Sequence, residues 1–126
     1  MEENKKCACA SSDMRVVTCS GGSNVGQIAN QAAVMLAREK VAGFFCLAGI
    51  GAHIKGMVKS GKEADLIISI DGCPVQCAAK TMQHVEIEPA IQVIVTEFGI
   101  EKSHEMVVDE MVSSRIVEKV KEELAA

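Results

Sequence analysis

Hydrophobic residues along the chain form four short runs rich in β-branched side chains, each separated by more polar stretches. Short runs of this composition are typical of β-strands. The third run, which contains LIISI at 66–70, is apolar on both faces, as in a central parallel strand covered by helices on both sides. We therefore predict strands at 15–20, 44–48, 65–70 and 91–96.

The segments between and after these runs carry apolar residues at helical spacing. Ser23 and Asn24 are candidate N-caps for the first such segment, and Pro74 suits the first turn of the third. Near the carboxyl end an apolar residue recurs every four positions among charges, which is typical of a surface helix with one buried stripe. We predict helices at 25–36, 52–62, 73–83 and 108–124, the second being weaker because Gly56 interrupts it.

Strands and helices alternate along the chain, and this order predicts an α/β fold with right-handed crossovers. We expect a single three-layer α/β/α domain over 15–126, with a mainly parallel four-stranded sheet in the strand order 2-1-3-4. Residues 1–14 are polar and without periodicity, so we expect a flexible N-terminal arm there.

The chain has 126 residues, a net charge of −4, no Trp or Tyr, three Phe and six Cys. An acidic chain with so few aromatic residues is a poor candidate for binding nucleic acid or an anionic membrane. It has neither a secretory signal nor a run long enough to span a bilayer, so we expect a cytoplasmic protein. In that reducing compartment, several cysteines in a well-cored domain are more often metal ligands or reactive thiols than disulfides.

Three cysteines occupy similar places in successive strand-helix units. Cys19 lies near the end of the first predicted strand, Cys46 in the second, and Cys73 just after the third, at intervals of 27 residues. The carboxyl ends of parallel strands lie on one edge of the sheet, where open α/β sheets bind their ligands. We therefore expect these cysteines to gather at that edge.

Cys77 follows Cys73 by four residues, which on a helix places both on one face. Four thiolates in a tetrahedral arrangement suit Zn²⁺, and a shell closed by protein sulfur is structural or a metal store. Two alternatives remain open. Cys46 and Cys19 are also compatible with small buried hydrophobic residues. A thiol redox or sulfur-transfer enzyme would use Cys73 as nucleophile and Cys77 as resolving thiol.

Three blocks of the chain, in order, resemble the DGC-domain family of zinc-binding proteins, which is named for an Asp-Gly-Cys triplet. The blocks are CSGGSNVGQ at 19–27, CLAGIG at 46–51 and IDGCPVQCA at 70–78. The resemblance covers about 15–99 and brings no established reaction with it. It implies a zinc ion bound by Cys19, Cys46, Cys73 and Cys77.

Other polar residues near these blocks have simpler expected roles. Asp71 could accept hydrogen bonds from a metal ligand or cap a helix, but we favour a role in organising the turn. His53 is an alternative ligand, although an exposed loop histidine is the simpler interpretation. We expect His84 and His104 to face solvent, and Lys80 to lie on the helix face of the cysteine pair. The role of Cys7 and Cys9, in the arm, stays open.

Overall fold

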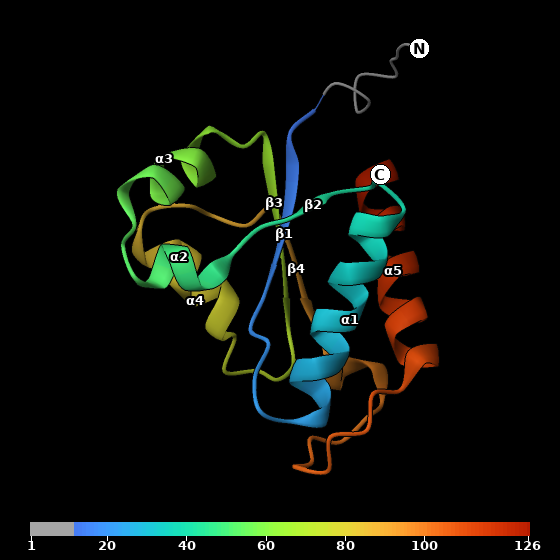
Figure 1. Cartoon of the computed structure of the whole chain (residues 1–126). Coiled ribbons are helices and arrows are strands. Elements are labelled where there is room, and N and C mark those ends of the chain that lie inside the picture. Colours follow the sequence, from blue (N-terminus) through green and yellow to red (C-terminus); the bar gives the residue numbers. More distant parts are fainter. Residues whose placement is uncertain (1–11) are drawn as a thin grey trace.

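Four parallel strands form one sheet in the order β2-β1-β3-β4 (Figure 1). The structure is a computed structural model and describes residues 12–126. The α/β class and the predicted strand order are confirmed. The strands are β1 (Met14–Thr18), β2 (Gly43–Phe44), β3 (Leu66–Asp71) and β4 (Ile91–Ile94).

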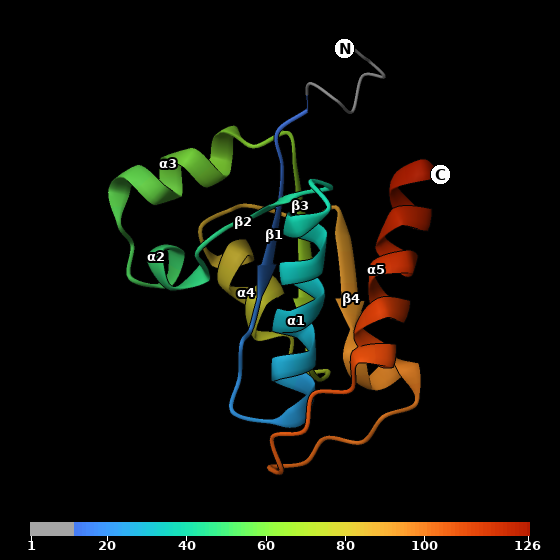
Figure 2. The same ribbon diagram turned by 45° about the vertical axis from the view of Figure 1, so that its right-hand side comes forward.

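Helices cover both faces of the sheet, which gives the three layers expected from the sequence (Figure 2). One face carries α1 (Asn24–Arg38) and α5 (Glu110–Ala125), which pack against each other. The opposite face carries α2 (Leu47–Gly51), α3 (Lys55–Glu63) and α4 (Cys77–His84). None of the described helices is long and apolar enough to cross a bilayer.

Strand residues alternate between two hydrophobic clusters, one under each helical layer. On β1, Val16 packs under α1 and α5, whereas Val17 packs under α2 and α4. On β3, Ile68 likewise packs under α1 and α5, and Ile67 packs under α2 and α4. Successive side chains of a strand point to opposite faces, so a central strand with helices on both sides must be apolar throughout. The sheet is therefore fixed by buried side chains from both layers.

The second strand is shorter than predicted, the helix predicted at 52–62 begins later, as α3 at Lys55, and a separate short helix, α2, precedes it. The chain leaves the sheet after Phe44, and α2 begins at Leu47, where the sequence suggested strand. The break between α2 and α3 lies at His53 and not at Gly56. His53 has a left-handed backbone (φ 58°), and the Ile54 amide donates to the Gly49 carbonyl. This is a Schellman ending, which reverses the chain after α2.

The helix after β3 begins later than predicted. It starts at Cys77, because Gln76 has a left-handed backbone (φ 56°, ψ 52°) that a helix cannot include. Cys73 and Gln76 close a turn instead, with the Gln76 amide donating to the Cys73 carbonyl at 3.1 Å. The prediction that this helix begins at Cys73, with Pro74 in its first turn, is therefore wrong. Consequently Cys73 and Cys77 do not share one helix face.

At the amino end, β1 begins one residue before the predicted domain boundary. The Asp13 amide donates to the Asp65 carboxylate at 2.6 Å, so the residues just before β1 are tied to the start of β3. The rest of the predicted arm, with Cys7 and Cys9, lies outside the described residues.

The fourth strand is also shorter than predicted. It ends at Ile94 and continues as the short 3-10 helix η2 (Val95–Phe98), where the Thr96 amide donates to the Gly72 carbonyl. A segment without regular structure, 99–109, then crosses the carboxyl edge of the sheet before α5 begins. Its contacts with the cysteine loops are described below.

Candidate functional site

The four cysteines of the described chain all lie where strands end and helices begin. Cys19 follows β1, Cys46 immediately precedes α2, Cys73 follows β3, and Cys77 is the first residue of α4. All four are free thiols, with Cys46 and Cys77 exposed and Cys19 and Cys73 half-buried. Exposure of Cys46 rules out its interpretation as a buried core residue. All four therefore lie at the predicted edge of the sheet, but within residues 12–126 the structure does not bring three of them together as the sequence led us to expect.

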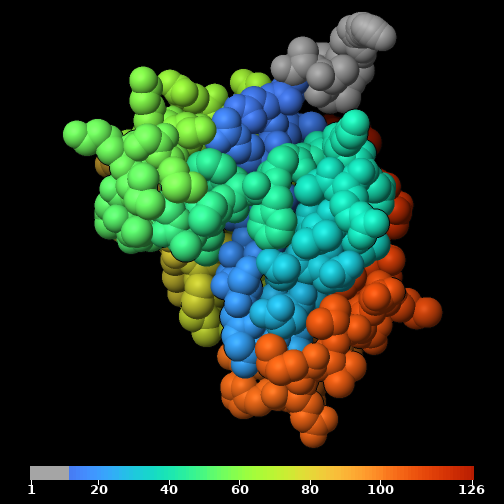
Figure 3. Space-filling view, viewed as in Figure 1, coloured from blue at the N-terminus to red at the C-terminus, as the bar shows by residue number. Residues whose placement is uncertain are grey.

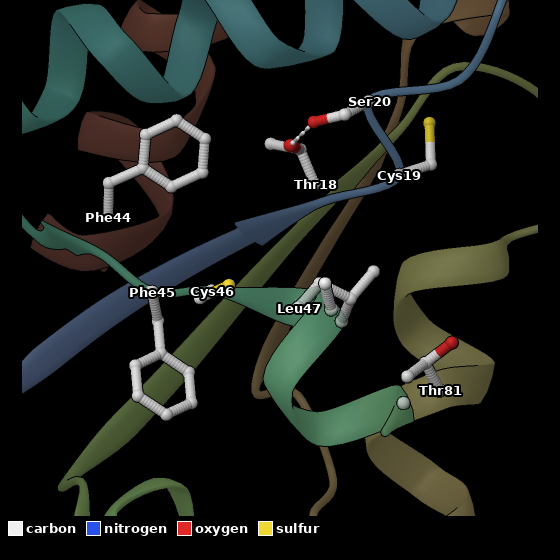
Figure 4. Close-up of a pocket in the computed structure, with 10 residues that line it drawn as sticks. Thr18, Cys19, Ser20, Phe44, Phe45, Cys46, Leu47 and Thr81 are labelled. Atoms are coloured by element: carbon white, nitrogen blue, oxygen red, sulfur yellow. Dashed lines mark hydrogen bonds between the residues drawn. The ribbon is translucent and has the colours of Figure 1, made fainter. Parts of the chain in front are cut away.

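Cys19 and Cys46 line the same open cavity, which has a volume of about 470 Å³ (Figure 4). Phe44 and Phe45 form part of the apolar wall of this cavity, and Thr81 of α4 lines its opposite side. In Figure 4 the Cys19 sulfur points away from Cys46, so the two thiols share the cavity without facing each other. The remaining lining residues are Thr18, Ser20, Leu47, Ala48 and Gly51.

The Cys19 sulfur is held by the backbone of the loop after β3. The Gly72 amide donates to Cys19 Sγ at 3.4 Å. Gly72 itself lies so close to the first turn of α1 that a β-carbon there would be 2.7 Å from the Gly26 nitrogen and 2.8 Å from the Val25 carbonyl carbon. Only glycine allows this approach of backbone to backbone. An amide donor to sulfur is the kind of contact that surrounds metal-bound thiolates.

Asp71 is a helix cap, one of the alternatives considered for it, and not chiefly an organiser of the turn. Its carboxylate accepts hydrogen bonds from the Ala78 amide at 2.7 Å and the Ala79 amide at 3.1 Å. These amides belong to the first turn of α4, and amides in the first turn of a helix have no carbonyl acceptor within that helix. Burial of Asp71 raises its pKa, although the two amides and Lys80 act in the opposite direction. Asp71 thus ties the end of β3 to the start of α4.

The Cys73 sulfur lies 3.8 Å from the Lys102 ammonium, which can donate a hydrogen bond to it. Lys102 belongs to the irregular segment 99–109, which no periodic pattern in the sequence marks. Lys80, the lysine expected beside the cysteine pair, lies on α4 and instead contributes its charge to Asp71. Lys102 is therefore the basic residue of the site that sequence reasoning missed.

Asn24 holds this segment in place. The Asn24 amide donates a hydrogen bond to the Ser103 carbonyl at 2.9 Å. In return, the Ser103 amide donates to the side-chain oxygen of Asn24 at 2.6 Å. Its side-chain nitrogen donates to the Glu101 carbonyl at 2.9 Å. In Figure 3 the segment covers the lower end of the molecule beside the start of α1. Because Lys102 lies between the two clamped residues, Asn24 positions it next to Cys73.

Two residues with left-handed backbones flank the cysteines. Ser20 (φ 47°) directly follows Cys19, and Gln76 (φ 56°) directly precedes Cys77. Residues other than glycine adopt this conformation at a cost of about 1–3 kcal/mol when surrounding contacts impose it. Ser20 is held by bonds to Thr18 (2.9 Å) and Asn30 (2.8 Å). The backbone is thus constrained next to two of the four thiols.

The donor set suits Zn²⁺ in its chemistry but not in its arrangement. Four sulfur ligands at one accessible edge match the preference of zinc for thiolates. Within residues 12–126, however, no three His, Cys, Asp or Glu side chains lie close enough together to hold a metal ion. His53, considered as a replacement ligand, does not line the cysteine cavity. Zinc would therefore require these side chains to move toward one another.

Comparison with known proteins agrees with the three sequence blocks. The family model for the DGC domain matches residues 15–120. The chain belongs to the DGC-domain family. Among curated relatives of this DGC domain is the "Anaerobic and virulence modulator AnvM" of Pseudomonas aeruginosa, 34% identical over 89 residues, which are 71% of this chain and 68% of that protein. No solved structure matches the chain.

In this DGC domain each residue of the naming triplet has a separate structural task. Asp71 caps α4, Gly72 packs on α1 and donates to Cys19, and Cys73 faces Lys102. The triplet therefore connects β3 to both neighbouring helices and to two of the four cysteines. Its position at the carboxyl end of a central strand explains how three consecutive residues reach so many partners.

Proposed function

We propose that this DGC domain binds one Zn²⁺ through the thiolates of Cys19, Cys46, Cys73 and Cys77. The observation that carries the proposal is the placement of four free, solvent-reachable thiols at one edge of the sheet. The reducing cytoplasm expected from the sequence would keep these thiols available for a metal. A shell closed by four sulfurs leaves no position for a reacting water, so the role is metal storage, transfer or structural support.

Binding would require a rearrangement of the cysteine loops, since the thiols are not grouped in the arrangement described above. The Gly72 amide limits where Cys19 can move, whereas Cys46 and Cys77 are exposed and have room to rotate. The turn at 73–76 must also release Cys73 from Lys102. Once the shell has closed, the bound ion would hold this turn in one arrangement. Zinc binding should therefore slow hydrogen exchange of the amides in the turn.

Zinc content of protein purified without oxygen and without added metal tests the proposal. We expect one zinc per chain, and its loss when Cys73 or Cys77 is replaced by serine. The matched control is the double variant Cys7→Ser/Cys9→Ser, which changes two cysteines outside the proposed ligand set and should keep its zinc. Zinc that survives Cys73→Ser and Cys77→Ser unchanged, or that disappears only in the control, contradicts the proposal.

The contact of Lys102 with Cys73 favours a second candidate function, thiol exchange. In such a reaction the Cys73 thiolate attacks a disulfide or persulfide of a partner and displaces the other sulfur as a thiolate. Cys77 then attacks the mixed disulfide, closes a bond to Cys73 and releases the second sulfur. This route uses no metal and needs Cys73 to be the most reactive thiol.

Alkylation mapped by mass spectrometry distinguishes this candidate. Neutral iodoacetamide should modify Cys73 of metal-free protein before the other cysteines, and Lys102→Met should slow that modification because the donor to the sulfur is lost. Lys80→Met is the control, since Lys80 lies on α4 and has no bond to a cysteine among the hydrogen bonds of the described chain. Equal rates at all four cysteines, or equal effects of the two lysine variants, would exclude it.

A further inference from the structure

Two histidines, one just after α2 and one at the end of α4, meet on the surface of the α2–α4 layer. His53 follows α2 and His84 ends α4, and their Nε2 atoms lie 3.0 Å apart with the rings edge to face. Both side chains are exposed, as expected for each of them singly. Their contact could not be foreseen, because 31 residues separate them and only the packing of α2 on α4 brings them together.

The orientation of His84 is fixed by its other ring nitrogen. Nδ1 lies 2.6 Å from the Thr81 carbonyl oxygen, which can only accept a hydrogen bond, so Nδ1 carries the proton. Nε2 of His84 therefore has a free lone pair directed at His53. A histidine whose remote N–H is bonded to a backbone carbonyl is the usual form of a metal-ligating imidazole.

His53 is fixed through its backbone. It occupies the left-handed position of the Schellman ending of α2, where its amide donates to the Ile50 carbonyl at 3.0 Å. In the metal-free protein its Nε2–H donates to Nε2 of His84, since that atom has no proton of its own. When His53 binds a cation through Nε2, the proton leaves that atom and the neutral ring carries its proton on Nδ1.

We propose that His53 and His84 form a two-histidine site for a divalent transition-metal ion such as Zn²⁺ or Cu²⁺, separate from the cysteines. Zinc–nitrogen distances of about 2.0–2.1 Å place two tetrahedral ligands roughly 3.3 Å apart, so the pair need open by only about 0.3 Å from its 3.0 Å separation. Imidazole suits these ions, and the remaining coordination positions are open to water or to a ligand from another molecule.

The charges around the pair set a condition on its affinity. Lys55, Lys59 and Lys62 line an open groove beside His53, together with Glu63. Their excess positive charge opposes a cation and is screened by salt. Binding at the histidines should therefore hold or strengthen as ionic strength rises. Non-specific attraction of the cation to an acidic chain of net charge −4 should weaken instead.

The test uses the full chain with every thiol blocked by N-ethylmaleimide, so that its result does not depend on the cysteine proposal. Zn²⁺ is titrated while the ring nitrogen signals of the histidines are followed by NMR. The chain has three histidines, and His104 is the internal control. Its Nδ1 also faces a backbone carbonyl, that of Gly22 at 3.2 Å, but none of the hydrogen bonds or ring contacts of residues 12–126 pairs it with a second imidazole.

We expect the signals of His53 and His84 to shift together at the same zinc concentration, with His104 unchanged. His84→Gln should weaken binding at least about tenfold, because a single imidazole has no second ligand held close by. His53→Gly, which tolerates the left-handed backbone, should do the same, and His104→Ala should not. Simultaneous shifts of all three histidines, or unchanged affinity in His84→Gln, would overturn the proposal.

Discussion

Replacing Gly72 with alanine tests the packing that places the cysteine loops. A β-carbon at this position would lie 2.7 Å from the Gly26 nitrogen and 2.8 Å from the carbonyl carbon of Val25. Both atoms belong to the backbone of the first turn of α1, so no side-chain rotation can remove the clash. Either α1 or the end of β3 must shift, and the hydrogen bond from the Gly72 amide to Cys19 then lengthens.

The expected cost follows from the nature of these contacts. Overpacking a well-filled site typically costs 1–3 kcal/mol, and rigid backbone partners place Gly72→Ala toward the upper end, at about 2–3 kcal/mol. The entropy of unfolding, about 2.1 cal/mol/K per residue, gives about 0.26 kcal/mol/K for 126 residues. The midpoint of thermal unfolding should therefore fall by about 8–11 °C.

Urea and thermal unfolding followed by far-ultraviolet circular dichroism measure this effect, because the chain has no Trp for fluorescence. Gly56→Ala is the matched control. Gly56 lies in α3, and a β-carbon there would meet nothing within 4 Å. Since alanine favours a helix over glycine, the control should gain up to about 1 kcal/mol. If Gly72→Ala is as stable as the parent, or if both variants lose the same stability, the packing argument is wrong.

Four further results are expected. Asp71→Ala should cost about 2 kcal/mol in a urea titration because it leaves two amides of α4 without an acceptor, and Asp71→Asn, which keeps one acceptor oxygen, should cost less. Burial raises the pKa of Asp71 above its ordinary 3.8, so the folded protein keeps the proton on this carboxyl up to a higher pH than the unfolded chain does. The free energy of unfolding should therefore fall as pH rises from about 3.8 through the folded pKa. Asp71→Ala should abolish this fall. Lys40→Gly should stabilise the fold by up to about 1 kcal/mol and raise the midpoint of thermal unfolding, because the exposed Lys40 follows α1 with a left-handed backbone (φ 61°) that glycine adopts without strain. An unchanged or lower midpoint would contradict this. Reconstitution with Co²⁺ should produce thiolate-to-metal absorption in a near-ultraviolet region that is almost empty without Trp and Tyr, and its absence would count against a four-sulfur site.

The strand order could be predicted because it depends on long-range rules that the sequence expresses directly. Alternating apolar runs and helical periods require crossovers, and the apolar third run requires a central position. The start of α4 could not be predicted, because it depends on a left-handed glutamine at 76 and on capping by Asp71 from another element. Neither leaves a mark in local composition.

The cysteines and their neighbours show the same division. Their common edge follows from topology, so Cys19, Cys46 and Cys73 could be assigned to it from spacing alone. Lys102 could not, because it reaches Cys73 from an irregular segment that Asn24 anchors. Side chains that meet through loops are fixed by tertiary hydrogen bonds, and one sequence gives no period or motif for them.

Native mass spectrometry of the full chain, purified without oxygen, tests the central claim most directly because it counts and identifies the bound metal. With His84→Gln present throughout to remove the histidine site, the account predicts one zinc ion per chain, retained in Cys7→Ser/Cys9→Ser and lost in Cys73→Ser and Cys77→Ser. A chain that carries no metal, or one whose zinc stays bound when Cys19, Cys46, Cys73 and Cys77 are all replaced by serine, would contradict it.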